Sequence, residues 1–166
     1  AKVATKLSEL NINILDITQT ILGGYFTMMM VVDLDGAHIC YTPVSVGNPH
    51  AVVFVDDAET VPLTELGPKI ERHKAFPDGV NAEFVQVLSE NELRMRVWER
   101  GSGITMACGT GACASAMAAV AKGYWDYNTP IYVRLDGGTL QIVIAPDNTV
   151  TMTGPAETVY EGEVSI

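Results

Sequence analysis

The residue types best suited to chemistry lie in one segment, ERGSGITMACGTGAC, from Glu99 to Cys113. Cys108 stands where this glycine-rich loop turns into a helical pattern. The unpaired N–H groups at a helix start carry partial positive charge, so they bind anions such as carboxylates and favour a thiolate over a thiol. Cys108 is therefore a candidate acid, base or nucleophile. A buried cysteine beside a tight glycine turn is the alternative, and the local pattern leaves both open.

Small and polar residues around this cysteine and at two other turns extend the candidate site. Gly109 lets backbone donors approach a ligand closely, and Thr110 can cap the helix. Asn48 and His50 flank a proline at a turn between two apolar runs, and Asn81 follows a Pro-Asp-Gly break. Each can contact a ligand, but an asparagine at such a place can equally form a simple Asx-turn.

The remaining cysteines, Cys40 and Cys113, are predicted to be structural. Cys113 lies deeper in the helical pattern, where free cysteine usually packs as a small hydrophobe, and Cys40 lies on a predicted strand. Three cysteines at these spacings fit no structural zinc site, and an odd number indicates free thiols in a reducing compartment.

A helix and a series of strands must position these residues. The run ACASAMAAVAKGY is small and apolar on nearly every face, which predicts a central helix surrounded by strands. A shorter helix is expected over 62–72, and the alternating segments AEFVQVL and ELRMRVWER predict antiparallel strands. Residues 1–10 have helical spacing, and two apolar runs around Gly23-Gly24 predict a hairpin.

The whole chain has the composition of a globular protein. Its 166 residues are 48% hydrophobic and 18% charged, which excludes a disordered chain. A formal net charge of −10 argues against nucleic acid and anionic membrane as partners. Because there is neither a bilayer-length apolar run nor a signal peptide, the sequence predicts a cytoplasmic protein.

Four stretches resemble the C-terminal half of the diaminopimelate epimerase family. They are SVGNPHAVVFVDD, GPKIERHKAFPDGVNAEFVQV, RVWERGSGITMACGTGACASA and VTMTGPAETVYEGE, and they occur in the family's order. The resemblance implies an epimerase of lysine biosynthesis that uses no cofactor and no metal. In that family two cysteines, one from each half, remove and return the α-proton of an amino acid on opposite faces.

The family's site residues carry over to matching positions of this chain. The resemblance implies three catalytic residues, Cys108, Glu99 and His50, and five substrate-binding residues, Asn48, Asn81, Arg100, Gly109 and Thr110. Two departures stand out: the family usually has Arg at the position of Gly79 and often Glu at that of Ile104. The larger departure is that the family's N-terminal half, with its own cysteine loop, has no counterpart in these residues.

The start of the chain resembles something else. KVATKLSELNINILDITQTILGGYFTMMMVVDL is similar to the helix–strand–strand portion of an ACT domain, a small βαββαβ ligand-binding module. The hypothesis is a chimera, with an ACT-like fragment over 1–35 joined to an epimerase-like segment over 36–166, folded as a single domain over 1–166. The expected fold class is α+β, with mostly antiparallel strands wrapped around the Ala-rich helix as a half-barrel and the N-terminal helix and hairpin completing the sheet.

Function then depends on how many thiols face the substrate. Inversion at an α-carbon needs an acid and a base on opposite faces, and one thiol serves one face. A lone copy is therefore expected to be an inactive remnant of a diaminopimelate epimerase. One alternative is a homodimer that places two Cys108 thiols across one cleft. Another is a recombined or engineered structural protein, or a module that binds small carboxylates or amino acids without catalysis.

Overall fold

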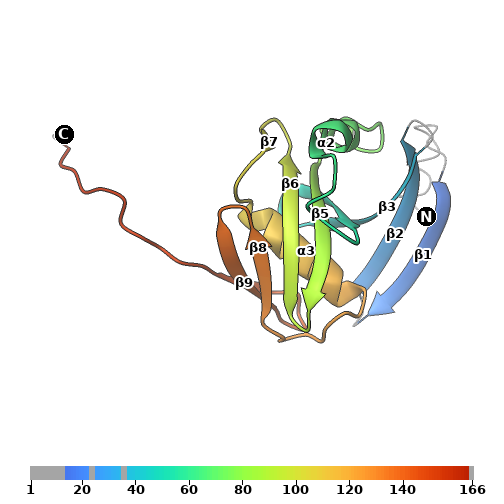
Figure 1. Cartoon of the computed structure of the whole chain (residues 1–166). Coiled ribbons are helices and arrows are strands. Elements are labelled where there is room, and N and C mark those ends of the chain that lie inside the picture. The colour runs from blue at the N-terminus through green and yellow to red at the C-terminus, as the bar shows by residue number, and fades with distance from the viewer. Residues whose placement is uncertain (1–13, 23–24, 35–36, 165–166) are drawn as a thin grey trace.

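One long mixed sheet curls around a single helix (Figure 1). The structure is a computed structural model that describes residues 14–22, 25–34 and 37–164. The strands are β1 (Ile14–Leu22), β2 (Tyr25–Leu34), β3 (Ala37–Ser45), β4 (Pro49–Phe54), β5 (Asn81–Ser89), β6 (Glu92–Glu99), β7 (Gly103–Ile104), β8 (Ile131–Leu135), β9 (Gly138–Ile144) and β10 (Val150–Thr153). The helices are α2 (Leu63–Glu71) and α3 (Gly109–Ala121).

The order of the strands explains where the two helices lie. The sheet runs β1-β2-β3-β4-β5-β6-β8-β9-β10, with β7 paired to β6. Neighbours are antiparallel except for β4–β5 and β6–β8, which are parallel. A parallel pair needs a crossover connection, and here α2 connects the first pair and α3 the second. The result is an α+β fold with a curled half-barrel sheet.

The two helices cover opposite faces of the central strands. Ala82 and Phe84 of β5 belong to the apolar cluster under α2, whereas Val85 belongs to the cluster around α3. Successive side chains of a strand point to opposite faces, so a strand between two helices is buried on both. The first five residues of β5 are accordingly all buried.

α3 is helical and central for reasons visible in its composition. Alanine has the strongest helix propensity, and the five alanines of α3 that are buried let strands approach closely. The helix contacts β3, β4, β5, β6, β8, β9 and β10. Its first turn begins after Cys108, whose extended backbone (φ −136°) is typical of an N-cap.

The N-terminal strands continue the ladder at the edge of the sheet. β1 pairs with β2 and β2 with β3, both antiparallel, and Figure 1 shows this hairpin beyond β3. The helix expected over 1–10 lies outside the described residues, as do the turns at 23–24 and 35–36. Cys40 of β3, expected to be structural, is exposed. Within the described ranges, no helix is long and apolar enough to span a bilayer.

Candidate functional site

The alternation of side chains along three neighbouring strands brings the polar residues of the site together. His50 of β4 is opposite Asn81 of β5, and Glu83 of β5 is opposite Val97 of β6. Glu83 shares its face of the sheet with Val97 and therefore with Glu99, two residues further along β6. This face is the one that α3 covers, because Val97 packs in the cluster around α3.

Cys108 is held at the start of α3 by its own helix. Its side chain accepts a hydrogen bond from the Gly111 backbone N–H, with 3.3 Å between N and Sγ. The Thr110 Oγ1 lies 3.6 Å from Sγ. Gly111 also allows the helix to approach β5, because a Cβ there would lie 2.9 Å from Glu83 Oε1 and 3.1 Å from Cys108 Sγ. Cys108 is 6% exposed, so it lies at the floor of the site.

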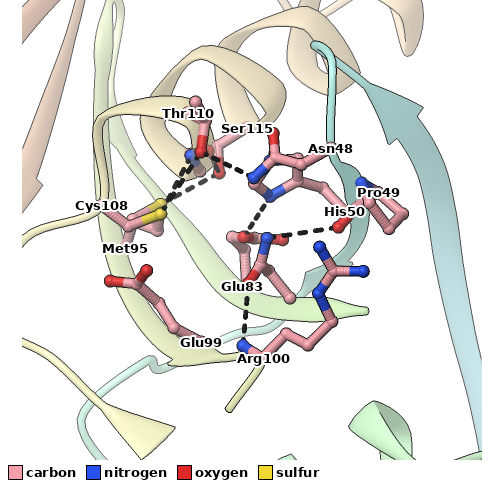
Figure 2. Close-up of polar contacts among 12 residues, drawn as sticks. Asn48, Pro49, His50, Glu83, Met95, Glu99, Arg100, Cys108, Thr110 and Ser115 are labelled. Carbon is pink, nitrogen blue, oxygen red and sulfur yellow. Dashed lines mark hydrogen bonds and ion pairs between the residues drawn. The ribbon is translucent and has the colours of Figure 1, made fainter. Parts of the chain in front are cut away.

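A chain of polar side chains leads from the interior to this cysteine (Figure 2). His50 Nδ1 lies 2.6 Å from Glu83 Oε1, and both side chains are fully buried. His50 Nε2 lies 3.0 Å from Asn48 Oδ1, and Asn48 Nδ2 donates to Thr110 Oγ1 at 3.2 Å. Four of the predicted residues, Asn48, His50, Thr110 and Cys108, therefore form one network.

Glu83 anchors the buried end of that network. Burial raises the pKa of its carboxyl, and the hydrogen bond and charge of His50 oppose that rise. Its Oε2 atom is buried without a hydrogen-bond partner among the described residues. A carboxylate in such surroundings is costly unless it is paired, so the contact with His50 is what makes this position tenable.

The acidity of Cys108 differs from the expectation for a helix start. Burial raises the pKa of the thiol, and the carboxylates of Glu99 and Glu83 raise it further. The hydrogen bonds from Thr110 and Gly111 lower the pKa but do not outweigh burial. The N–H groups of the helix start therefore favour the thiolate, as expected, but desolvation outweighs them.

Asn81 and Arg100 form a second contact next to the network. The Asn81 side chain donates to the Pro49 carbonyl at 3.3 Å and accepts from the Arg100 backbone N–H at 2.8 Å. Arg100 Nη1 donates to the Asp78 carbonyl at 3.0 Å. Gly79 has φ +76°, and a Cβ there would lie 2.9 Å from Arg100 Cδ. The missing side chain at position 79 thus makes room for the Arg100 side chain.

The last predicted residues lie at the rim of the Cys108 region. Glu99 accepts a hydrogen bond from the Thr105 hydroxyl, and its charge acts on the Cys108 thiol. Gly109 is the first residue of α3 and lies next to Met152 of β10. Among the described residues, no cluster of three or more His, Cys, Asp or Glu side chains could hold a metal ion.

Sequence reasoning missed Glu83 and Thr105. Glu83 occupies the polar position of an alternating strand, and such a position is normally solvated. It is buried here because α3 packs on that face of β5. The usable signal was a single carboxylate at the third position of NAEFVQV, a segment whose other residues carry no charge. Thr105 lies within the segment that was singled out, but nothing in its spacing marks it.

Comparison with known proteins identifies close relatives. The model of the diaminopimelate epimerase family matches residues 42–159. A diaminopimelate epimerase from Bacillus licheniformis is 60% identical over 125 residues, which are 75% of this chain and 44% of that protein. One from Azotobacter vinelandii is 52% identical over 136 residues, 81% of this chain and 49% of that protein. The chain therefore spans less than half the length of these relatives.

Two solved structures share the fold at low sequence identity. A hydroxyproline epimerase from Agrobacterium vitis superposes with a TM-score of 0.51 and 14% identity, covering 78% of this chain and 51% of that one. A probable proline racemase from Agrobacterium radiobacter has a TM-score of 0.51 and 13% identity, covering 78% and 52%. At these identities the likeness concerns the fold alone.

Proposed function

Since this chain belongs to the diaminopimelate epimerase family, we propose that it carries one half of a cofactor-independent epimerase site. Cys108 would exchange the α-proton of diaminopimelate on one face of the substrate. The observation that carries this proposal is the placement of the Cys108 thiol at the start of α3. The Gly111 N–H donates to its sulfur, the Thr110 hydroxyl lies 3.6 Å from it, and the charge of Glu99 acts on it.

The other residues take roles that follow from their chemistry. Glu99 assists proton movement at Cys108, and His50 assists an acid or base on the opposite face. Five residues bind the substrate: Asn48, Asn81, Arg100, Gly109 and Thr110. Their amide, guanidinium and helix-start N–H groups can hold the carboxylate of an amino acid.

Proton transfer through a single thiol predicts exchange without inversion. Cys108 as thiolate takes the α-proton and, as a thiol, returns a proton to the same face. Inversion needs a second acid on the other face. The chain has two further cysteines: Cys40 is exposed and Cys113 packs against the apolar cluster around α3. We therefore infer that one copy alone does not epimerise.

The experiment follows α-deuteration and configuration together. The full chain is incubated in D₂O with LL- and with meso-diaminopimelate, and products are analysed by mass spectrometry and chiral chromatography. We expect deuterium at one α-carbon with its configuration retained. Cys108→Ala should abolish this exchange, and Cys113→Ser, the matched control from the same helix, should retain it. Absence of both exchange and calorimetric binding would refute the proposal.

Oligomeric state decides whether two copies restore inversion. Sedimentation gives the fraction of dimer at each concentration, and a coupled assay with LL-diaminopimelate gives the inversion rate. Inversion by the monomer would contradict the single-thiol argument. Inversion that rises with the dimer fraction and is lost in Cys108→Ser would instead assign the second thiol to a partner copy. We place this chemistry in the cytoplasm, where thiols stay reduced.

We also propose that residues 1–35 are an ACT-like fragment whose hairpin protects the sheet. The family match begins at residue 42, and β2 pairs along β3. Deleting residues 1–35 would leave β3 as an edge strand, and an exposed edge favours aggregation. We expect the truncated protein to aggregate or to unfold without cooperativity. A soluble truncated protein with cooperative unfolding would contradict this part.

A further inference from the structure

The network that ends at Cys108 has a direction, which its donors and acceptors define. Asn48 turns its carbonyl Oδ1 to His50 Nε2 and its Nδ2 to Thr110 Oγ1. A carbonyl oxygen only accepts and an amide nitrogen only donates. His50 Nε2 therefore carries a hydrogen, and the Thr110 oxygen accepts one from Asn48.

The same reasoning applies at both ends. The Thr110 oxygen accepts from Asn48, which leaves its hydroxyl hydrogen available to Cys108 Sγ, 3.6 Å away. A thiolate has no hydrogen to give, so once Cys108 is ionised Thr110 must be the donor in this contact. At the other end, the 2.6 Å contact between His50 Nδ1 and Glu83 Oε1 holds one proton. That proton makes either an imidazolium–carboxylate or an imidazole–carboxylic acid pair, and both are neutral overall.

We propose that Thr110 is a positioning residue for Cys108: Asn48, itself oriented by the buried His50–Glu83 pair, makes the Thr110 hydroxyl donate to Sγ and so stabilises the thiolate. The Gly111 backbone N–H supplies the second donor to the same sulfur. Two donors on one sulfur form a cradle for the negative charge that appears when the thiol loses its proton.

This donor matters because burial and the nearby acidic side chains work against ionisation of the thiol. Burial penalises the thiolate most, the Glu99 carboxylate on β6 repels it, and the Glu83 carboxyl on β5 adds to the repulsion when it is ionised. Cys113 on α3 interacts with the same sulfur. On β4, the His50 ring is in contact with Glu83 through Nδ1 and not with Cys108. The Thr110 hydroxyl is thus the side chain that can lower the pKa of Cys108 against these effects.

The inference deepens the proposed function and rests on it for its biological meaning, because the thiolate is the base that α-proton removal requires. It can be tested without any substrate. The thiolate is titrated by its absorbance near 240 nm and by the pH dependence of iodoacetamide alkylation, in a Cys40→Ser/Cys113→Ser background so that Cys108 is the only thiol.

The first comparison uses Thr110→Val, which keeps the shape and removes the hydroxyl. We expect the pKa of Cys108 to rise by about one unit, roughly tenfold less thiolate at a fixed pH below the pKa, since hydrogen bonds to charged groups are of that size. Thr110→Ser restores the hydroxyl and should restore the pKa. An unchanged or lowered pKa in Thr110→Val overturns the proposal, because a lowered value means that the hydroxyl accepts from the thiol.

The second comparison asks whether Asn48 acts through Thr110. Asn48→Leu keeps the volume and removes the amide, so we expect the pKa of Cys108 to rise. The double variant with Thr110→Val should have a pKa no higher than that of Thr110→Val alone. If the pKa shifts of the two single variants add fully in the double variant, Asn48 does not act through Thr110 and the proposal is overturned, since the effects of independent groups are additive. Circular dichroism at each pH ensures that only folded protein is compared.

Failure of this inference and failure of the proposed function have different signatures. If the pKa of Cys108 rises in Thr110→Val as expected while diaminopimelate is neither bound nor exchanged, the positioning role of Thr110 is supported and the epimerase half-site is refuted. If exchange depends on Cys108 but the pKa of Cys108 does not change in Thr110→Val, the proposed half-site is supported and the positioning role of Thr110 is refuted.

Discussion

Two charged clusters of this protein have similar short contacts and opposite surroundings. In the interior, His50 and Glu83 join β4 to β5, and both side chains are fully buried. On the outside, Arg94 contacts Glu59 at 2.5 Å and also Asp136. Glu59 is 61% exposed, whereas the exposed fraction of Glu83 is zero. Contact geometry alone would therefore rank the two clusters as equals, which their surroundings contradict.

The difference in exposure determines how much each charged pair contributes to the free energy of unfolding. When the 61% exposed Glu59 is removed, Arg94 keeps Asp136 as its partner, and pairs with such an exposed member are usually worth about 0–1 kcal/mol. When a partner of the buried pair is removed, the remaining group keeps its burial and loses its compensation. Removing one member of the buried pair should therefore lower the free energy of unfolding strongly, whereas replacing both members should change it little.

The largest expected effect comes from breaking the buried pair. Glu83→Ala leaves His50 in the interior without its Nδ1 partner and opens a cavity against α3. We expect the free energy of unfolding to fall by about 3–5 kcal/mol. Urea denaturation followed by fluorescence measures it. Glu59→Ala is the matched control from the exposed cluster and should cost less than about 1 kcal/mol. Equal losses in the two variants would remove the basis of the comparison.

Replacing both members of the buried pair should undo most of that loss. His50→Leu combined with Glu83→Leu fills the space with apolar atoms and leaves no uncompensated polar group except Asn48 Oδ1. Paired apolar replacements are often neutral or stabilising, so we expect stability within about 1–2 kcal/mol of the unaltered protein. A double variant as unstable as Glu83→Ala in the same denaturation assay would mean that the pair itself stabilises the fold.

The sequence could predict the outward direction of the arginines near one cluster, but neither the contacts of that cluster nor the burial of Glu83. Alternation in ELRMRVWER places Arg94 and Arg96 outward and Leu93, Met95 and Val97 inward, and both arginines are partly exposed in the structure. The same rule applied to AEFVQVL places Glu83 in solvent, and it fails because two helices cover the two faces of β5. Alternation reports which residues share a face, but not what lies on that face.

The sequence nonetheless predicts the helix that follows Cys108 and the class of the fold around the site. The Ala-rich run after Cys108 indicates a helix start from local composition alone, because helix propensity and capping are local properties. The α+β class follows from alternating strands around such a helix. The partnership of His50 with Glu83 spans strands far apart in the sequence, and parallel register has no local signal. The acidity of Cys108 likewise depends on burial, which only the assembled fold defines.

The next largest effect is the pH dependence that the buried Glu83 gives to the free energy of unfolding. Burial raises the pKa of Glu83 in the folded state, so its protonated form favours folding. Its stabilising contribution is fully present below the ordinary glutamate pKa and is lost as the pH rises through the raised folded-state value. We therefore expect the free energy of unfolding of the unaltered protein, relative to Glu83→Gln, to decrease as the pH rises above the ordinary glutamate pKa, by about 1.4 kcal/mol per unit of raised pKa. A difference that increases with pH over this range would contradict the assignment.

The smallest expected effect concerns salt, and it tests the exposed side of the comparison. Arg134 contacts Glu92 across the β6–β8 junction, and the Arg134 side chain is 55% exposed. A double-mutant cycle with Arg134→Gln and Glu92→Gln should give a coupling free energy of about 0.2–1 kcal/mol at low salt. Raising NaCl to about 1 M shortens the screening length to roughly 3 Å, so this coupling should nearly vanish. The cycle for His50 and Glu83 should change little over the same range, because salt does not enter the interior. An exposed coupling that persists at high salt, or a buried one that disappears, would show that solvent access does not decide how strongly two charged groups are coupled.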